Sequence, residues 1–261
     1  TWSVNSLSGI TIDGRGHKIS NLTVSGKAQV GLYNTVSNVA FKNLILDNFN
    51  VTCLSSTAYV CALFCSAAGT VDVTNVYVNA NLRGYKQVAA FGGWNGGTLN
   101  LTNVLVTGVI NATGTSDNHS GVLVSGGGTT ICKNVLSLAM LRNDNCDGWF
   151  RGSGKLDTSS SGVYGLNWGT LQNDTKLGFS EGLTPDQLLG AAAKTTLKEF
   201  DFENVWTTTS GYPTLKIAVG KVTDPTPTTK AGLDASLKDS ILGGSTATKN
   251  LASDLTLLGA Q

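Results

Sequence analysis

A short pattern of polar and apolar residues recurs along the first half of the chain. Its clearest copy is residues 71–78, Val-Asp-Val-Thr-Asn-Val-Tyr-Val, in which apolar positions alternate on both sides of an asparagine. Alternation with a period of two predicts a β-strand before and after a polar corner residue. The asparagines at the corner position are Asn21, Asn43, Asn75, Asn103 and Asn134.

These asparagines lie 22 to 32 residues apart, and repeats of that length are typical of solenoid folds. A third apolar segment that begins with a small residue precedes the two strands, as in residues 31–33 and 62–64. Each repeat therefore has three faces. We predict an all-β fold, a parallel β-helix in which equivalent residues of successive coils stack and the corner asparagines form one hydrogen-bonded row.

The sequence after residue 179 departs from the repeat. Residues 184–187, Thr-Pro-Asp-Gln, predict the start of a short helix with a capping box. We expect this helix, together with Trp206 and Tyr212, to cover the last coil, whose core and strand edge would otherwise be exposed. The predicted organisation is a β-solenoid over residues 1–179, a cap segment over 180–220, and a Pro/Thr linker with an apolar extended tail over 221–261.

Composition favours a secreted β-protein. Only 13% of the residues are charged, and the chain contains 32 glycines with many Thr, Ser and Asn residues. The net charge of +1, without a basic cluster, argues against a nucleic-acid partner. No apolar run reaches the roughly 18 residues that a membrane span needs, so we predict no membrane span.

Six Asn-X-Ser/Thr sequons predict N-glycosylation and an extracellular or cell-surface location. Asn21 is expected to be the poorest acceptor, because it belongs to the row of corner asparagines inside the stack. Asn100 should point outward, since it alternates with Leu99 and Leu101. The sequon asparagines predicted to carry glycans are Asn50, Asn100, Asn111, Asn118 and Asn173.

The cysteines are Cys53, Cys61, Cys65, Cys132 and Cys146. In an oxidising compartment their odd number leaves at least one unpaired or paired with another chain. We expect Cys53 to pair with Cys61 or Cys65, and Cys132 to pair with Cys146, although buried thiols would also suit several of these positions. Their spacing and the lack of histidine partners disfavour zinc, and we predict no metal and no cofactor.

Residues 7–24, followed by residues 30–33 and 39–44, resemble the GLUG-type repeat of large secreted, adhesin-like surface proteins of bacteria and protists. Residues 200–216 resemble an ending found in such proteins. The resemblance covers roughly residues 7–217 and implies a right-handed parallel β-helix displayed outside the cell. The chain departs from the repeat in the Cys-rich insertion at residues 53–65 and in the looser repeat at Asn134.

The leading functional hypothesis is a secreted, non-enzymatic structural or adhesive surface protein. In this hypothesis the chain is a subunit of an extracellular fibre, a head-to-tail homo-oligomer in which solenoids stack end to end. A free first strand containing Trp2 and Val4 would form one half of the contact. The apolar tail would either reach the next copy or fold back on its own solenoid.

Two alternatives remain open at this stage. A carbohydrate-active lyase or glycoside hydrolase would need carboxylates that converge on one face. The acids are instead scattered, and the densest group, Asp144 and Asp147 beside Arg142 and Arg151, is typical of a solvated turn, so no catalytic residue is predicted. A glycan-binding module would use exposed aromatic side chains, for which the candidates are Trp94, Trp149 and Trp168.

Overall fold

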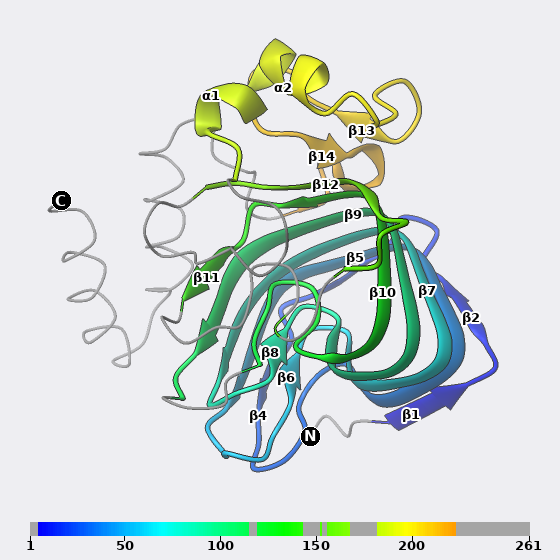
Figure 1. Cartoon of the computed structure of the whole chain (residues 1–261), viewed down its shortest axis with the longest axis vertical. Helices are drawn as coiled ribbons and strands as arrows, with labels where there is room; N and C mark the ends of the chain where they lie inside the picture. The colour runs from blue at the N-terminus through cyan, green and yellow to red at the C-terminus, as the bar shows by residue number, and fades with distance from the viewer. Residues whose placement is uncertain (1–4, 115–118, 143–151, 153–155, 168–181, 223–261) are drawn as a thin grey trace, which may run out of the picture.

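The computed structural model describes residues 5–114, 119–142, 152, 156–167 and 182–222 (Figure 1). They form a parallel β-solenoid of about five turns, which confirms the predicted β-helix. Its strands are β1 (Asn5–Ser8), β2 (Thr11–Asp13), β3 (Lys18–Ser20), β4 (Thr23–Ser25), β5 (Tyr33–Cys53), β6 (Val60–Cys61), β7 (Phe64–Gly84), β8 (Val88–Ala89), β9 (Gly92–Ala112), β10 (Gly127–Ser137), β11 (Met140–Arg142) and β12 (Ser161–Gly165).

Successive coils pair in parallel along the order β1, β5, β7, β9, β10 and β12. Strands β2, β3 and β4 also pair with β5, strand β11 pairs with β9, and the short strands β6 and β8 pair on the third face. The register aligns Phe41 with Val73, and Val73 with Leu101, and all three side chains are completely buried. Equivalent apolar positions therefore form columns through the core, as the alternation predicted.

The corner asparagines form a hydrogen-bonded row with one polarity. The side-chain amide of Asn134 donates to Asn103 at 3.3 Å, Asn103 donates to Asn75 at 3.0 Å, and Asn75 donates to Asn43 at 3.2 Å. Each Nδ2 thus donates to the Oδ1 of the preceding coil. This confirms the predicted row for four of its five proposed members.

The prediction for Asn21 is wrong. The row ends at Asp13, whose Oδ1 accepts a hydrogen bond from Asn43 at 3.1 Å. Asn21 instead accepts from Asn48 at 2.8 Å, at the next corner of the coil. The reason is the register of the first coil, in which Asp13 aligns with Lys42 and Ser20 aligns with Asp47.

The backbone gives a second reason for asparagine at the corner. The φ angles are 50° at Asn43, 55° at Asn75, 53° at Asn103 and 54° at Asn134, in the left-handed region that asparagine tolerates better than most residues. In the next coil the aligned position is Gly162, with φ 62°. The left-handed corner therefore continues one coil beyond the asparagine row.

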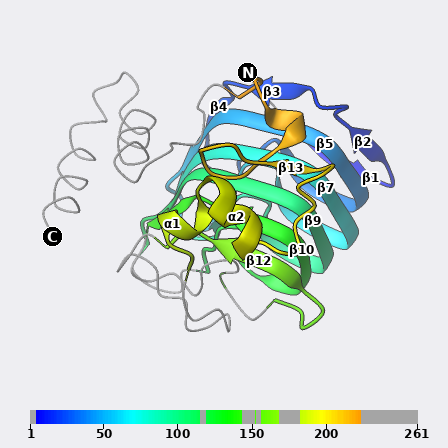
Figure 2. The same cartoon turned by 90° about the horizontal axis from the view of Figure 1, so that it is seen from above.

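The residues after the solenoid form a lateral segment, residues 182–222, that lies along the side of the coils (Figures 1 and 2). It contains α1 (Pro185–Leu188), α2 (Gly190–Thr196), β13 (Trp206–Thr207), β14 (Thr214–Leu215) and the 3-10 helix η1 (Lys216–Ala218). The predicted capping box between Thr184 and Gln187 is confirmed at the start of α1. The predicted helix is interrupted at Leu189, whose backbone is extended.

The expectation that Trp206 and Tyr212 cover the last coil is wrong. Both side chains are buried in a second core, built on residues that point outward from successive coils. These aligned residues are Ile45, Tyr77, Leu105, Leu136 and Tyr164. Because this column runs from the second coil to the last, the segment covers a side of the solenoid, and Lys221 Nζ donates to Gly16 O of the first coil at 2.6 Å. The linker and tail from residue 223 onward lie outside the described residues.

Substitution at Asn103 separates the two roles of the corner residue. Asn103→Ala removes two side-chain hydrogen bonds and places a Cβ-bearing residue without a polar group at positive φ, so we expect a loss of about 3 kcal/mol of unfolding free energy. Asn103→Gly loses the same hydrogen bonds without the backbone strain and should be about 1 kcal/mol more stable than the alanine variant. Urea unfolding followed by circular dichroism measures both. Equal stability of the two variants would contradict the backbone argument.

Truncating Trp206 tests the second core. Its side chain is completely buried, with its ring centroid 4.5 Å from that of Phe200, so Trp206→Ala should cost about 3–5 kcal/mol. Protease cleavage within the lateral segment should accelerate in parallel. Val219→Ala is the control, because Val219 is 56% exposed and its truncation should change stability by no more than about 0.5 kcal/mol.

Candidate functional site

The first coil, residues 5–25, is the most unusual surface of the solenoid. Its strands β1, β2, β3 and β4 each pair with β5 along one edge. Among the described residues no strand pairs with their opposite edge. The first coil therefore presents backbone N–H and C=O groups that a further β-strand could bind.

Apolar side chains of the first coil lie at core positions that no further coil of the described residues covers. Leu7, Ile12 and Val24 are only partly buried, and Ile19 is 38% exposed. Their register partners in the second coil, Val36, Phe41, Val51 and Leu46, are all completely buried. The difference arises because each core residue of the second coil has a coil on both sides, whereas its partner in the first coil has one among the described residues.

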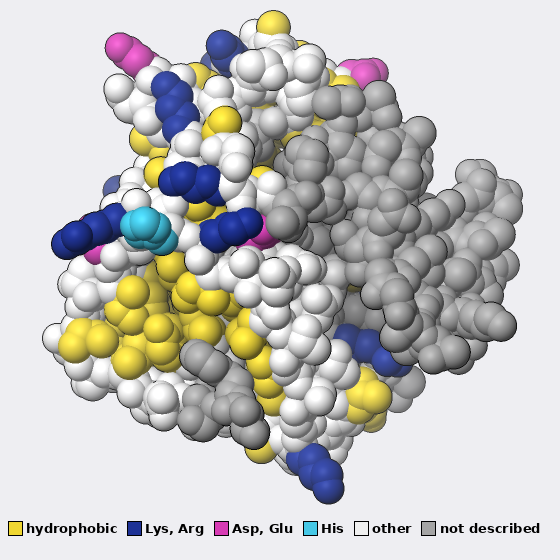
Figure 3. All heavy atoms as spheres, turned by 180° about the vertical axis from the view of Figure 1, so that it is seen from behind, with side chains coloured by type: hydrophobic (Ala, Val, Ile, Leu, Met, Phe, Trp, Pro, Cys, Tyr) yellow, Lys and Arg dark blue, Asp and Glu magenta, His cyan; other side chains and the backbone are white. Residues whose placement is uncertain are grey.

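Ile10, which is 43% exposed, and the partly buried Leu22 extend this surface. Figure 3 shows a broad hydrophobic surface on one side of the molecule, next to a histidine and several Lys and Arg side chains. Scattered exposed apolar residues are ordinary on proteins, but a contiguous apolar patch marks a site of interaction.

The turn between β2 and β3 lies beside this surface. Asp13 Oδ1 accepts hydrogen bonds from the backbone N–H of Arg15 at 2.9 Å and from Asn43, and these bonds lower the pKa of its carboxyl group. Arg15 and Gly16 both have positive φ, of 50° and 71°. Asp13, Arg15 and His17 thus belong to a tight turn at the start of the stack, and this carboxylate has a structural role.

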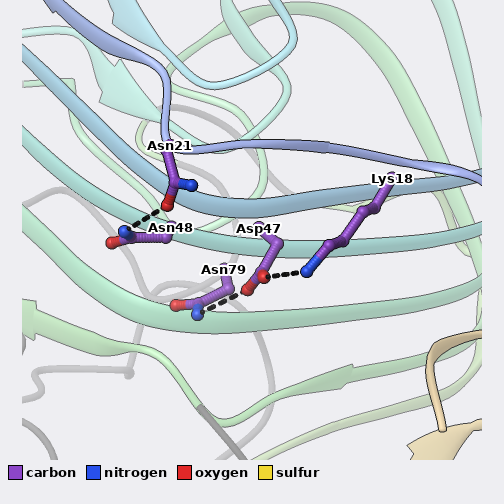
Figure 4. Close-up of polar contacts among 5 residues, drawn as sticks. All are labelled: Lys18, Asn21, Asp47, Asn48 and Asn79. Atoms are coloured by element: carbon purple, nitrogen blue, oxygen red, sulfur yellow. Dashed lines mark hydrogen bonds and ion pairs between the residues drawn. The ribbon is translucent and has the colours of Figure 1, made fainter. Parts of the chain in front are cut away.

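A polar cluster around the buried Asp47 attaches the first coil to the second and third (Figure 4). The carboxylate of Asp47 is completely buried and accepts from Lys18 Nζ at 3.4 Å and from Asn79 Nδ2 at 3.3 Å. Beside it, Asn48 Nδ2 donates to Asn21 Oδ1 at 2.8 Å. A buried carboxylate needs such partners, so Asp47 fixes the position of β3 against β5.

In three polar contacts between coils, the acceptor in the earlier coil is an aspartate. Asn43 donates to Asp13, Asn79 donates to Asp47, and Asn100 donates to Asp72 at 2.8 Å. A carboxylate accepts but does not donate, so it suits the position in which no donation to a preceding coil is required. These three contacts and the asparagine row therefore run in one direction, from each coil to the coil before it, and give the two ends of the row different chemistry.

The sequon asparagines differ in how their side chains are used. Asn100 is half-buried between the buried Leu99 and Leu101, and its Nδ2 donates to Asp72. Asn50 is also half-buried, and its Nδ2 donates to Asn48 Oδ1 at 3.4 Å. Asn111 is half-buried, and Asn118 and Asn173 lie outside the described residues. Asn21, the expected poorest acceptor, is exposed. Glycosylation of each sequon stays a prediction.

The predicted disulfides within the Cys53, Cys61 and Cys65 cluster are wrong. These cysteines and Cys132 are free thiols with an exposed fraction of 1% or less. They take core positions, since Cys132 aligns with Leu101 and Cys61 aligns with Ala89. Cys146, the proposed partner of Cys132, lies outside the described residues.

Burial also sets the ionisation of three of these thiols, those of Cys61, Cys65 and Cys132. It raises the pKa of Cys65 and of Cys132 to about 12 in each case. Burial, with a smaller contribution from Cys65, raises the pKa of Cys61 well above its usual range. Because the thiolate is the reactive form, Cys61, Cys65 and Cys132 are chemically inert parts of the core.

Of the remaining candidate site residues, few lie in the described part of the chain. Trp94 is 41% exposed, while Trp149 and Trp168 lie outside the described ranges. No group of three His, Cys, Asp or Glu side chains that could hold a metal ion occurs in the described part of the chain. None of the helices in that part is long and apolar enough to cross a membrane.

Comparisons with models of known protein families, with curated proteins and with solved structures found no match to this chain. The resemblance to GLUG-type repeats therefore stays a prediction that rests on the residues given above.

Thiol labelling tests the assignment of the cysteines. A rise in pKa from 9.0 to about 12 lowers the thiolate fraction at mildly alkaline pH about 1000-fold, so Cys65 and Cys132 should react with iodoacetamide only after unfolding. Peptide mass spectrometry of native and guanidinium-unfolded samples reports each site. Rapid native labelling at either residue would contradict its burial.

The raised pKa values of Cys65 and Cys132 also make the stability of the fold depend on pH. The unfolded chain loses these thiol protons near its ordinary pKa of 9.0, and the folded chain keeps them up to about 12. The stabilising contribution is therefore complete below about pH 9 and is lost as the pH rises toward 12. The urea midpoint should fall across this range, and the fall should be smaller in the Cys132→Ala variant.

Proposed function

We propose that the protein is a secreted, non-enzymatic structural or adhesive surface protein that assembles through its first coil. The observation that carries this proposal is the combination, on one surface of residues 5–25, of strand edges that no described strand pairs with and core positions that no described coil covers. In such a contact, backbone pairing fixes the direction of the added strand, and burial of apolar side chains contributes binding free energy.

The proposed assembly is a head-to-tail fibre. In it, the apolar tail of one copy, residues 223–261, covers the first coil of the next. Heterologous contacts of this kind do not close on themselves and can propagate. The tail contains the apolar side chains that a cover of the first coil requires, at Leu233, Leu237, Ile241, Leu242, Leu251, Leu255, Leu257 and Leu258.

The asparagine row has no part in this contact. It begins at Asp13, which has no amide to donate, and the position after Asn134 is Gly162, which has no side chain. Continuation of the row from one copy into another would leave these two residues facing each other without a donor. The proposed contact therefore depends on apolar burial and backbone pairing at the first coil.

The roles of the described acids favour this proposal over the carbohydrate-active enzyme. Asp13, Asp47 and Asp72 accept hydrogen bonds from asparagines of following coils, and Asp157 and Asp201 accept from Ser159 and Asn204 two and three residues later. Each of these five carboxylates is thus committed to a structural contact. A glycan or other cell-surface ligand remains the second candidate partner, because Trp94 exposes an aromatic face suited to sugar stacking.

Charge placed on the first coil should prevent assembly. Ile10 and Ile19 are 43% and 38% exposed, so the double variant Ile10→Glu, Ile19→Glu should fold while placing two carboxylates in the contact. Sedimentation velocity over a concentration series, with electron microscopy of the same samples, should show larger species for the unmodified full chain and monomer for the variant.

Leu54→Glu is the matched control, because Leu54 is 51% exposed and follows β5, outside the first coil. It should assemble like the unmodified chain. Monomeric behaviour at every concentration of the full chain without substitutions, produced in bacteria and so without glycans, would overturn the proposed fibre.

A further inference from the structure

Asn21 occupies a distinctive place in the first coil. It lies between β3 and β4, its side chain is exposed, and with Leu22 and Thr23 it forms an Asn-X-Thr sequon. Its neighbours in sequence belong to the apolar surface, since Ile19 is 38% exposed and Leu22 and Val24 are partly buried. A group attached to Asn21 would stand beside the surface that the proposed assembly uses.

The hydrogen bonds of Asn21 leave its amide nitrogen available. Its backbone N–H donates to Asp47 O at 3.0 Å, and its Oδ1 accepts from Asn48 Nδ2. Among the described residues its Nδ2 has no acceptor, and Figure 4 shows this atom pointing away from Asn48. Both structural contacts of Asn21 would therefore survive a substituent on Nδ2.

The polarity of the amide contacts explains why this nitrogen is free. In the following coils, the Nδ2 of each corner asparagine donates to the preceding coil, as Asn75 does to Asn43, and Asn48 donates in the same direction to Asn21. Asn21 belongs to the first coil and has no preceding coil among the described residues. The half-buried Asn50 and Asn100 differ, because their Nδ2 atoms already donate to Asn48 and Asp72.

We propose that Asn21 is an N-glycosylation site and that its glycan controls assembly by covering the first coil. In the modification, Nδ2 forms a bond to the anomeric carbon of an oligosaccharide carried on a lipid diphosphate. The bond from that carbon to the diphosphate oxygen breaks, the lipid diphosphate leaves, and the Nδ2 proton passes to a base of the transferase. The remaining N–H of the amide stays on Nδ2.

The glycan is bulky and hydrated, so it keeps a partner strand away from the adjacent apolar side chains. The glycosylated chain remains a monomer, and the unmodified chain assembles. This inference rests on the proposed function in two respects: it requires passage through the secretory pathway, and it assigns a regulator to the assembly surface.

The test begins with the full chain secreted from eukaryotic cells behind a cleavable signal peptide. Trypsin cleavage after Lys18 and Lys27 releases residues 19–27, which contain Asn21 as their only asparagine. Removal of glycans with peptide N-glycosidase in heavy-oxygen water converts a glycosylated Asn21 into labelled aspartate, which mass spectrometry detects. We expect the label in most copies of this peptide.

Sedimentation velocity then compares the secreted chain before and after glycan removal, together with two variants. Asn21→Gln and Thr23→Ala both destroy the sequon, and Thr23→Ala keeps the hydrogen bond from Asn48 to Asn21. The secreted chain should sediment as a monomer, and the deglycosylated chain and both variants should assemble. Asn111→Gln is the control, since it removes a sequon outside the first coil and should leave the monomer unchanged.

An unlabelled Asn21 peptide from secreted chain would overturn the glycosylation site. A labelled peptide with no assembly after glycan removal would overturn the control of assembly. Chain produced in bacteria carries no glycan and so separates this inference from the proposed function. If that chain is monomeric at every concentration, the proposed fibre is wrong. The mass spectrum of the secreted chain still shows whether Asn21 is glycosylated.

Discussion

The left-handed corner between two strands is the constraint on which the rest of this protein depends. A coil can stack on the next only if its chain turns at the same place with the same geometry, and positive φ angles at Asn43, Asn75, Asn103 and Asn134 provide that turn. Asparagine satisfies the backbone and also donates to the coil before it. The uniform corner then aligns the strands on either side, so that apolar side chains form continuous columns in the core.

The direction of the amide contacts makes the two ends of the solenoid unequal. Each asparagine of the row donates to an acceptor in the preceding coil. The first member only has to accept, so it can be an aspartate, as Asp13 is. The same polarity leaves the amide nitrogen of Asn21, in the first coil, without an acceptor among the described residues. The proposed modification site beside the proposed assembly surface thus follows from one property of the asparagine row, which is that its amide donors point toward the amino-terminal end.

A second core on the outside of the coils explains the course of the carboxyl-terminal residues. Outward positions on this face are apolar from Ile45 through Tyr77 to Leu105, whereas the aligned position in the first coil is Lys18. An apolar column on the outside of a solenoid would expose a large hydrophobic surface, so it needs a cover. The lateral segment is that cover, and it ends at the first coil, where Lys221 contacts Gly16.

The sequence alone determined the parallel β-helix, the buried alternation around Val71 and Val73, and most of the asparagine row, because a fixed corner and a period of two leave a direct local signature. It also determined the capping box at Thr184. Only the tertiary structure decided the register of the first coil, which moves Asn21 out of the row, because that register depends on pairing with β5 rather than on residue spacing. The free thiols and the lateral placement of Trp206 were likewise decided in three dimensions, since a buried core position and a disulfide position carry the same sequence pattern, and an outward apolar column is recognised only when coils are stacked.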